Sequence, residues 1–312
     1  MDMGASVLAR LKNKSKETGK PLQLYLQLFC QEEFLRRLAV SRYSDHLVLK
    51  GGLFIYTLTN FESRATVDID FLLRQFPSTI DAIREMVEEI ISMDTGNDFI
   101  EFTSRGYEEI SPQRKYTGVS FQLIGNIKNT RTPFDVDFGV GDVIVPASER
   151  RELPVQLEGF ARPSVLTYSL ESTIAEKYDA LLQRLELTSR MKDIYDIYYL
   201  SNAFAFEGSK LQRAISETLK NRSTVYDSES LDRVIGLAQN KDIQIRWRQY
   251  FRRLKLDELS LDSVMEGIDS FLRPIWDSML QGITLNMSWS PEERQWKGNC
   301  SRTNPSNKSV YP

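Results

Sequence analysis

The chain has little histidine, little cysteine and no long apolar run. His46 is the single histidine among 312 residues, which excludes Ser-His-Asp triads in their usual form and zinc sites built from several histidines. Beside the apolar residues that follow it, His46 is expected to be a structural residue at the start of a strand. Cys30 and Cys300 fit no metal-ligand spacing and no disulfide framework. Catalysis here would therefore rely on carboxylates, lysines, hydroxyls or a bound metal.

The first residues contain no apolar signal-peptide core, and no run of about 18 apolar residues occurs anywhere. We therefore expect a soluble cytoplasmic protein in a reducing compartment, with no membrane contact. The net charge is −3 and the pI about 5.6, so the protein has no global basic field. Binding of RNA or DNA would need a local basic patch.

The hydrophobic pattern divides the chain into four parts. Residues 5–41 have a helical pattern, and we expect residues 1–45 to form a helical lead packed on a catalytic domain. Residues 46–160 are expected to form a small mixed α/β domain, with a helix at 78–93 and a hairpin over 116–145. Residues 161–290 are predicted to be helical, and residues 291–312 a loose polar tail.

Two strand-like segments carry paired aspartates. Around Asp68 and Asp70, the apolar Val67, Ile69 and Phe71 point one way, so both carboxylates and Thr66 point the other way. The segment Phe134–Phe138 repeats the pattern, and there Asp135 and Asp137 share the polar face. Clustered carboxylates raise one another's pKa unless a cation neutralises them, and Mg²⁺ suits such oxygen ligands. The alternative is that these are solvated outer faces of edge strands.

Gly51 and Gly52 stand between a short apolar strand and a helix-like run. Glycines allow backbone N–H groups to approach a phosphate at a helix N-terminus. The Lys-Ser/Thr of a Walker A loop is absent, and a simple tight turn is the alternative.

Two later segments add charges. Lys177 lies off the apolar stripe of a helix that starts near Ser169, and the run RMKDIYD (residues 190–196) opens the next helix. Alone, that run could be a charged helix start with local ion pairs. Residues 246–255 interleave basic and aromatic side chains, which could hold RNA. We favour an amphipathic helix there, with Trp247, Phe251 and Leu254 packed inward.

Together these segments resemble the polymerase-β-like nucleotidyltransferase fold, an α+β fold with a small mixed sheet flanked by helices. The more detailed similarity is to AbiEii-type nucleotidyltransferase toxins of abortive-infection and toxin–antitoxin systems. The similarity runs through nearly the whole chain, to about Trp289. It is carried by LKNKSKETGKPLQLYLQLFCQEEFLRRLAVSRYSDHLVLKGG (residues 11–52), RATVDIDFLLR, YTGVSF, DFGVGDVIVP and SLESTIAEKYDALLQRLELTSRMKDIYDIYYLS, and less closely by RWRQYFRRL and FLRP.

The resemblance implies roles for individual residues. Asp68, Asp70 and Asp137 would bind the metal, Mg²⁺ or Mn²⁺, and with Lys177 and Asp193 they form the catalytic set. Asp135 is extra and has no assigned role. The set expected to bind the NTP is Lys50, Gly51, Gly52, Arg64, Thr66, Lys177, Arg190, Lys192 and Asp196. Thr66 stands where many relatives have Ser, and the hydroxyl is kept.

The resemblance also implies a reaction: transfer of NMP from an NTP to RNA, with the tRNA 3′ end as the expected acceptor and pyrophosphate as the product. Such a toxin would block translation in a phage-defence system, and its partner would be an AbiEi-like, DNA-binding antitoxin. We expect a monomer. Two alternatives remain: a nucleotidyltransferase acting on a small molecule such as an antibiotic, and a non-catalytic NTP-binding sensor or scaffold.

Overall fold

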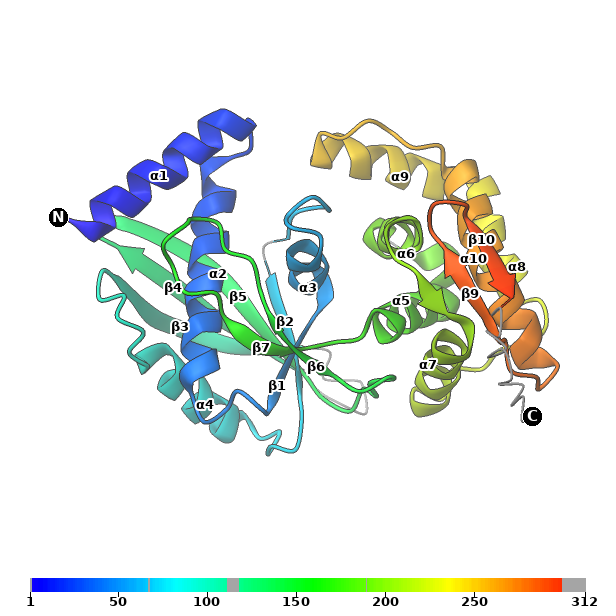
Figure 1. The fold of residues 1–312 in the computed structure, drawn as a ribbon, viewed down its shortest axis with the longest axis horizontal. Coiled ribbons are helices and arrows are strands. Elements are labelled where there is room, and N and C mark those ends of the chain that lie inside the picture. The colour runs from blue at the N-terminus through cyan, green and yellow to red at the C-terminus, as the bar shows by residue number, and fades with distance from the viewer. Residues whose placement is uncertain (1, 67, 111–117, 189, 299–312) are drawn as a thin grey trace, which may run out of the picture. The chain divides into compact units, whose positions relative to one another are not determined.

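The structure, a computed structural model, describes residues 2–66, 68–110, 118–188 and 190–298 (Figure 1). The chain forms two compact units: unit 1, Met1–Thr173, and unit 2, which starts at Ile174. This boundary lies later than residue 160, where the composition changes. The reason is that strand β7 (Ser164–Thr167) still pairs with the sheet of unit 1.

Unit 1 is a mixed sheet with helices packed on it. Its helices are α1 (Met3–Thr18), α2 (Leu22–Val40), α3 (Gly51–Leu58) and α4 (Ile80–Ser92). Its other strands are β1 (Leu47–Lys50), β2 (Asp68–Leu73), β3 (Ile100–Ile110), β4 (Gly118–Ile127), β5 (Thr130–Gly139) and β6 (Glu149–Glu152). The strand order is β3-β4-β5-β2-β1-β7-β6, with β2/β5 and β1/β7 parallel and the remaining pairs antiparallel. This architecture confirms the expected α+β class.

The helical lead is two helices rather than one continuous pattern. Gly19 closes α1 in a left-handed conformation (φ 69°), and Pro21 stands immediately before α2. Glycine tolerates positive φ, and proline cannot continue a helix from within. Val7 and Leu11 of α1 and most of the apolar side of α2 belong to the same core as the sheet. The lead is therefore part of unit 1.

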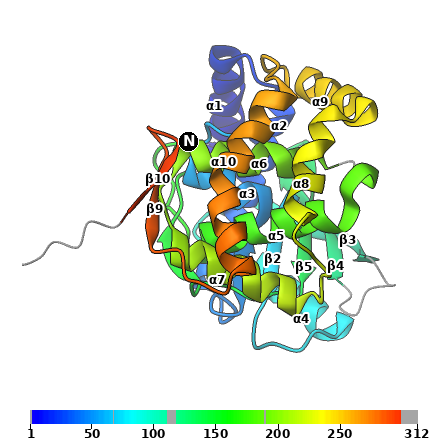
Figure 2. The same ribbon diagram turned by 90° about the vertical axis from the view of Figure 1, so that its right-hand side faces the viewer.

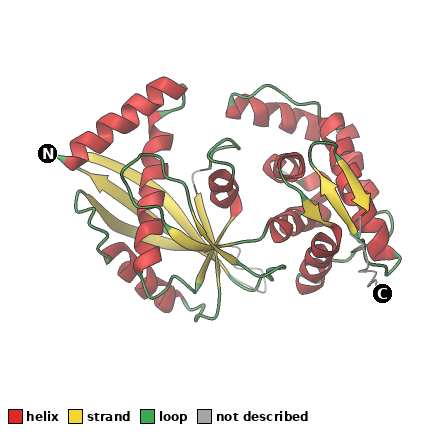
Figure 3. Ribbon diagram, in the orientation of Figure 1, coloured by secondary structure: helices red, strands yellow, loops and turns green. Residues whose placement is uncertain are grey.

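Alternation along the strands puts the core on one face of the sheet. Ile69 and Phe71 of β2 and Val136 and Phe138 of β5 are fully buried, and α2 crosses this part of unit 1 in Figures 1 and 3. The predicted hairpin is present: β4 and β5 pair from Ile127↔Thr130 outward. Residues 111–117, where its first strand was expected to start, lie outside the described residues, as does Val67.

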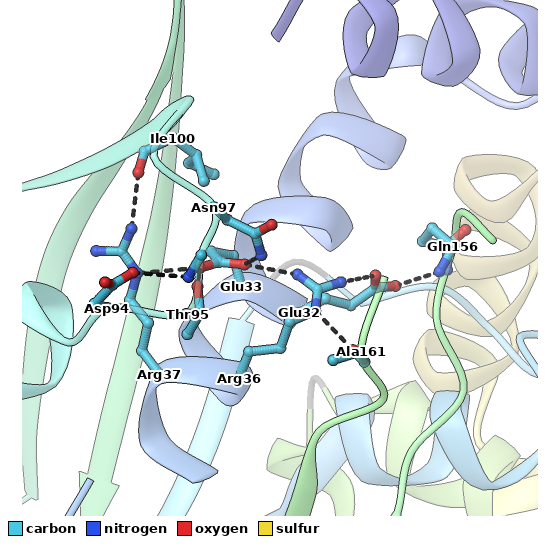
Figure 4. Close-up of polar contacts among 11 residues, drawn as sticks. Glu32, Glu33, Arg36, Arg37, Asp94, Thr95, Asn97, Ile100, Gln156 and Ala161 are labelled. Atoms are coloured by element: carbon cyan, nitrogen blue, oxygen red, sulfur yellow. Dashed lines mark hydrogen bonds and ion pairs between the residues drawn. The ribbon is translucent and has the colours of Figure 1, made fainter. Parts of the chain in front are cut away.

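Helix α2 also carries a buried network of charges (Figure 4). The carboxylate of Glu33, fully buried, accepts hydrogen bonds from Arg36 Nη1 at 2.8 Å and Arg37 Nε at 3.2 Å. Thr95 Oγ1 and Asn97 Nδ2 donate to it as well, at 2.5 and 2.7 Å. Buried charges persist only when they are paired in this way. The network therefore fixes α2 to the loop that follows α4.

Other sequence expectations in unit 1 also have an outcome. His46 lies immediately before β1, as predicted, and its Nδ1 is 3.1 Å from the Arg74 carbonyl oxygen. The helix expected at 78–93 is α4, and the side chain of Thr79 caps it by accepting a hydrogen bond from the Ala82 N–H. Cys30 is a buried free thiol, whereas Cys300 lies outside the described residues.

Unit 2 is mostly helical. Its elements are α5 (Leu170–Arg184, which begins in unit 1), α6 (Met191–Ala203), α7 (Gly208–Asn221), α8 (Ser230–Ile235), α9 (Lys241–Leu254), α10 (Leu261–Leu280) and the strands β8 (Phe206–Glu207), β9 (Met287–Ser290) and β10 (Gln295–Gly298). Short 3₁₀ turns follow α5 (Leu185–Leu187) and α8 (Gly236–Gln239). Helix α10, orange in Figure 2, packs against α6, α7 and α8.

The C-terminal segment differs from its prediction. A loose tail was expected from residue 291, but residues 295–298 form β10, which pairs with β9. The physical reason is aromatic packing: the Trp296 ring stacks on Phe271 at 5.9 Å and lies 5.5 Å from the Trp289 ring. Residues 299–312 lie outside the described part of the chain. No helix in the described ranges is both long enough and apolar enough to cross a membrane.

Candidate active site

Four aspartates lie on one face of the central sheet. Strands β2 and β5 run parallel, in a register that pairs Asp68 with Asp135 and Asp70 with Asp137. Residues opposite each other on neighbouring strands point to the same face, and the alternate residues of both strands are buried on the other face. The polar face predicted from alternation is therefore present, and it includes Asp135, whose role was left open.

The row of Asp70 and Asp137 continues onto both neighbouring strands. Lys50 of β1 is opposite Asp70, and Ser120 of β4 is opposite Asp137. Ser120 Oγ donates a hydrogen bond to Asp137 Oδ1 at 2.6 Å. Lys50 Nζ donates to Asp142 Oδ2 at 2.7 Å. Sequence reasoning missed Ser120 and the Lys50–Asp142 pair, although the register of the predicted hairpin could have placed Ser120 beside Asp137.

The electrostatics of this face favour a cation. The pKa of Asp137 is raised to about 6: burial is the largest cause, the Ser120 hydrogen bond acts in the opposite direction, and the charges of Asp70, Asp68 and Asp135 add to the rise. Among the described residues, no three acidic, histidine or cysteine side chains already converge on one point that could hold a metal. Mg²⁺ needs only one or two carboxylates, because waters and substrate phosphates complete its shell. The donor set of Asp68, Asp70 and Asp137 thus fits a cation that arrives with a nucleotide.

The glycine pair shapes the edge of this face. Gly51 follows β1 with φ +70°, and a Cβ built on it would lie 2.0 Å from Asp70 Oδ2. A Cβ on Gly52 would lie 2.8 Å from Thr66 Oγ1. Both positions therefore require glycine, because the Asp70 carboxylate and the Thr66 hydroxyl pack directly against the start of α3. Arg64, another expected NTP-binding residue, is half-buried in the loop before β2.

A second cluster of expected site residues lies within unit 2. Lys177 of α5 reaches α6, where its Nζ is 3.2 Å from Asp193 Oδ1 and 2.6 Å from Asp196 Oδ2. Arg190 Nε is 2.8 Å from Asp193 Oδ2. Lys177 is 9% exposed and Asp193 only 2%, whereas Lys192 is exposed. The charges of RMKDIYD form ion pairs and join two helices, as the interpretation by ion pairing predicts. The catalytic and NTP-binding roles that the resemblance implies for this segment stay predictions.

The basic and aromatic segment forms most of α9. Trp247, Tyr250 and Phe251 are buried, and Leu254 is half-buried. The favoured prediction of an amphipathic helix is confirmed. Base stacking on Trp247 or Phe251 is excluded in this arrangement, because both rings pack inward.

These features define a class of protein. MenT4, a nucleotidyltransferase toxin from Mycobacterium tuberculosis H37Rv, has the same fold with a TM-score of 0.51 at 18% identity, over 90% of this chain and 99% of that chain. A putative nucleotidyltransferase from H. pylori aligns with a TM-score of 0.42 at 14% identity, over 80% and 93% of the two chains. None of the curated proteins matches the sequence. The fold is that of nucleotidyltransferase toxins.

The family follows from the sequence match. The family model described as nucleotidyl transferase AbiEii toxin, type IV toxin–antitoxin system, matches residues 33–277. Because the match covers well over half of the chain, this protein belongs to the AbiEii nucleotidyltransferase toxin family. It is thus a nucleotidyltransferase. Because the family consists of toxins of type IV toxin–antitoxin systems, membership implies an antitoxin partner.

Proposed function

We propose that this toxin transfers a nucleoside monophosphate from an NTP to RNA, with the tRNA 3′ end as the acceptor, and so blocks translation. The observation that carries the proposal is the parallel register of β2 and β5, which gathers Asp68, Asp70, Asp135 and Asp137 on one face. A face with this much negative charge suits a cation–triphosphate complex.

The reaction follows from the chemistry of phosphoryl transfer. The acceptor hydroxyl oxygen attacks the α-phosphorus in line, a new P–O bond forms, and the bond to the β-phosphate breaks to release pyrophosphate. The hydroxyl proton leaves to solvent. Such a step needs positioning and charge neutralisation, and no histidine.

The chain's own residues would prepare this step. Asp68, Asp70 and Asp137 would hold Mg²⁺ or Mn²⁺, which neutralises the triphosphate and the developing negative charge when bound. Ser120 orients the Asp137 carboxylate through its 2.6 Å hydrogen bond. Gly51 allows Asp70 to pack against the start of α3. Lys50, Gly52, Arg64 and Thr66 are the further NTP-binding residues that we assign to unit 1.

For unit 2, we assign Lys177, Arg190 and Lys192 to nucleotide phosphates. Asp193 and Asp196 would position Lys177, since each lies within 3.2 Å of its ammonium group. We further propose that the protein acts as a monomer in the cytoplasm in defence against phage, and that an AbiEi-like, DNA-binding antitoxin neutralises it.

A transfer assay tests the proposal. Purified toxin is incubated with Mg²⁺, total tRNA and each of four α-labelled NTPs, and Asp70→Ala is the matched inactive variant. The expected result is label on tRNA with the wild type only, together with growth inhibition that Asp70→Ala abolishes. Absence of transfer with every NTP and RNA pool, while the protein binds Mg²⁺–NTP, would refute the RNA acceptor. Label on an aminoglycoside-type hydroxyl would instead favour the small-molecule alternative.

A further inference from the structure

Helix α9 has one face made almost entirely of basic residues. Successive helical residues turn by about 100°, so Lys241, Ile245, Arg248 and Arg252 lie along one stripe. All four are exposed. The opposite side contains Ile243, Trp247, Tyr250 and Phe251, all buried. Lys241, Arg248 and Arg252 are called the α9 basic stripe below.

The stripe contrasts with two paired arginines of unit 2: Arg222 is 3.0 Å from Asp179, and Arg273 is 2.6 Å from Asp232. Within the described ranges, Arg248 and Arg252 form no salt bridge of this kind. They stand four positions apart, where two like charges destabilise a helix. The helix dipole favours Arg252 in the last turn, but it does nothing for Arg248 in the middle.

The stripe sits on a rigid support. Trp247 Nε1 donates to the Leu259 carbonyl oxygen at 2.7 Å, and Arg246 Nη1 donates to the Thr188 carbonyl oxygen at 2.8 Å. The Phe251 ring contacts Tyr195 of α6, with ring centroids 5.8 Å apart. Helix α6 also carries Asp193 and Asp196. The stripe is therefore fixed to α6, the helix whose Asp193 and Asp196 pair with Lys177 of α5.

We propose that the α9 basic stripe binds the phosphate backbone of the RNA acceptor. This inference rests on the proposed function and specifies how the RNA is held. From Lys241 to Arg252 the stripe is about 16 Å long, which is long enough to contact several successive phosphates of an RNA strand. The contacts are independent of base sequence, because the aromatic side chains that could stack on bases are buried.

An acidic protein surface fits the stripe less well than RNA. Protein interfaces depend on buried aromatic and aliphatic anchors at their centre. Ile245, 44% exposed, is the one apolar side chain along this stripe. Phosphates, in contrast, require only closely spaced cations, and arginine is the preferred side chain for them.

The test compares two double charge reversals within unit 2. Arg248→Glu/Arg252→Glu alters the stripe, and Arg213→Glu/Lys220→Glu makes the same charge change on α7, where both residues are exposed. Affinity for total tRNA is measured between about 50 and about 200 mM salt. Arg248→Gln/Arg252→Gln removes the charges without adding acids. Mg²⁺–NTP affinity serves as the check that each variant is folded.

The stripe variants should bind tRNA at least about tenfold more weakly, with the slope of log K against log salt reduced by about two. The α7 variant should bind like the wild type, and all variants should keep their affinity for Mg²⁺–NTP. An unchanged salt slope in Arg248→Gln/Arg252→Gln would overturn the proposal. If stripe variants transfer nucleotide to RNA normally but escape the antitoxin, the stripe is a protein-binding surface and the proposal is wrong. If the wild type itself neither binds nor modifies RNA, both the proposed RNA acceptor and the proposed role of the stripe are wrong.

Discussion

Replacing Glu33 by glutamine should destabilise unit 1 strongly. Glu33 is fully buried and accepts hydrogen bonds from Arg36, Arg37, Thr95 and Asn97 (Figure 4). In Glu33→Gln the side chain keeps its shape but loses its charge, so the buried guanidinium groups of Arg36 and Arg37 lose the carboxylate that they share. Breaking a buried ion pair from one side costs about 3–5 kcal/mol.

That cost is a large part of the total stability of a domain, about 5–15 kcal/mol. For a domain of this size, it corresponds to a fall in melting temperature of roughly 6–20 °C. The matched control is Asp45→Asn, which removes a carboxylate that is 82% exposed and pairs with Arg150 at 2.6 Å. Exposed pairs of this kind contribute little, so the control should stay close to the wild type.

The assay can distinguish the two units. All four tryptophans, at positions 247, 276, 289 and 296, belong to unit 2, so tryptophan fluorescence reports on unit 2. Amide hydrogen exchange of β4 and β5 reports on unit 1. Glu33→Gln should lower protection in β4 and β5 by far more than Asp45→Asn does. Equal protection in the two variants would refute the reasoning about the buried network.

Two further predictions follow from the geometry. Gly51→Ala should lower nucleotide transfer by about a hundredfold or more, because the added Cβ would displace Asp70. The control Gly19→Ala has nearly the same φ but open space around it, so it should retain activity. Equal loss of activity in both variants would show that backbone strain, and not the contact with Asp70, causes the loss. Glu32→Gln should flatten the pH dependence of stability. Burial raises the pKa of Glu32 from its ordinary 4.5 to about 8, although the charge of Arg36 opposes the rise. Between these two pH values the folded wild type keeps a proton that the unfolded chain has lost, so the wild type loses stability as the pH rises. Urea unfolding at several pH values checks this, and an unchanged slope in Glu32→Gln would contradict it.

The sequence predicted the polar face of the site because alternation is a local property. In β2 and β5, apolar and acidic residues alternate with period two, and a strand turns such residues to opposite faces whatever its neighbours are. The glycine pair, the α4 cap and the inward packing of Trp247 were predictable for the same reason. Each depends on a few adjacent residues.

The features that the sequence did not predict depend on distant pairing. The parallel register that places Asp135 beside Asp68 is set by strands more than 60 positions apart, and no local pattern encodes it. The same holds for the salt bridge of Lys50 with Asp142 and for β7, which shifts the boundary of unit 1. In the C-terminal segment, the packing of Trp289 and Trp296 stabilises β10 although the composition of the segment is polar.

The central claim is that Asp70 and its neighbours hold a cation together with the nucleotide, and a binding titration tests it most directly. Mn²⁺ is titrated into the protein with a non-hydrolysable NTP, and bound metal is counted by electron paramagnetic resonance for the wild type and Asp70→Asn. The account predicts nucleotide-dependent Mn²⁺ binding in the wild type and its loss in Asp70→Asn, whose fold is verified by amide exchange. Equal Mn²⁺ binding in both proteins would contradict it.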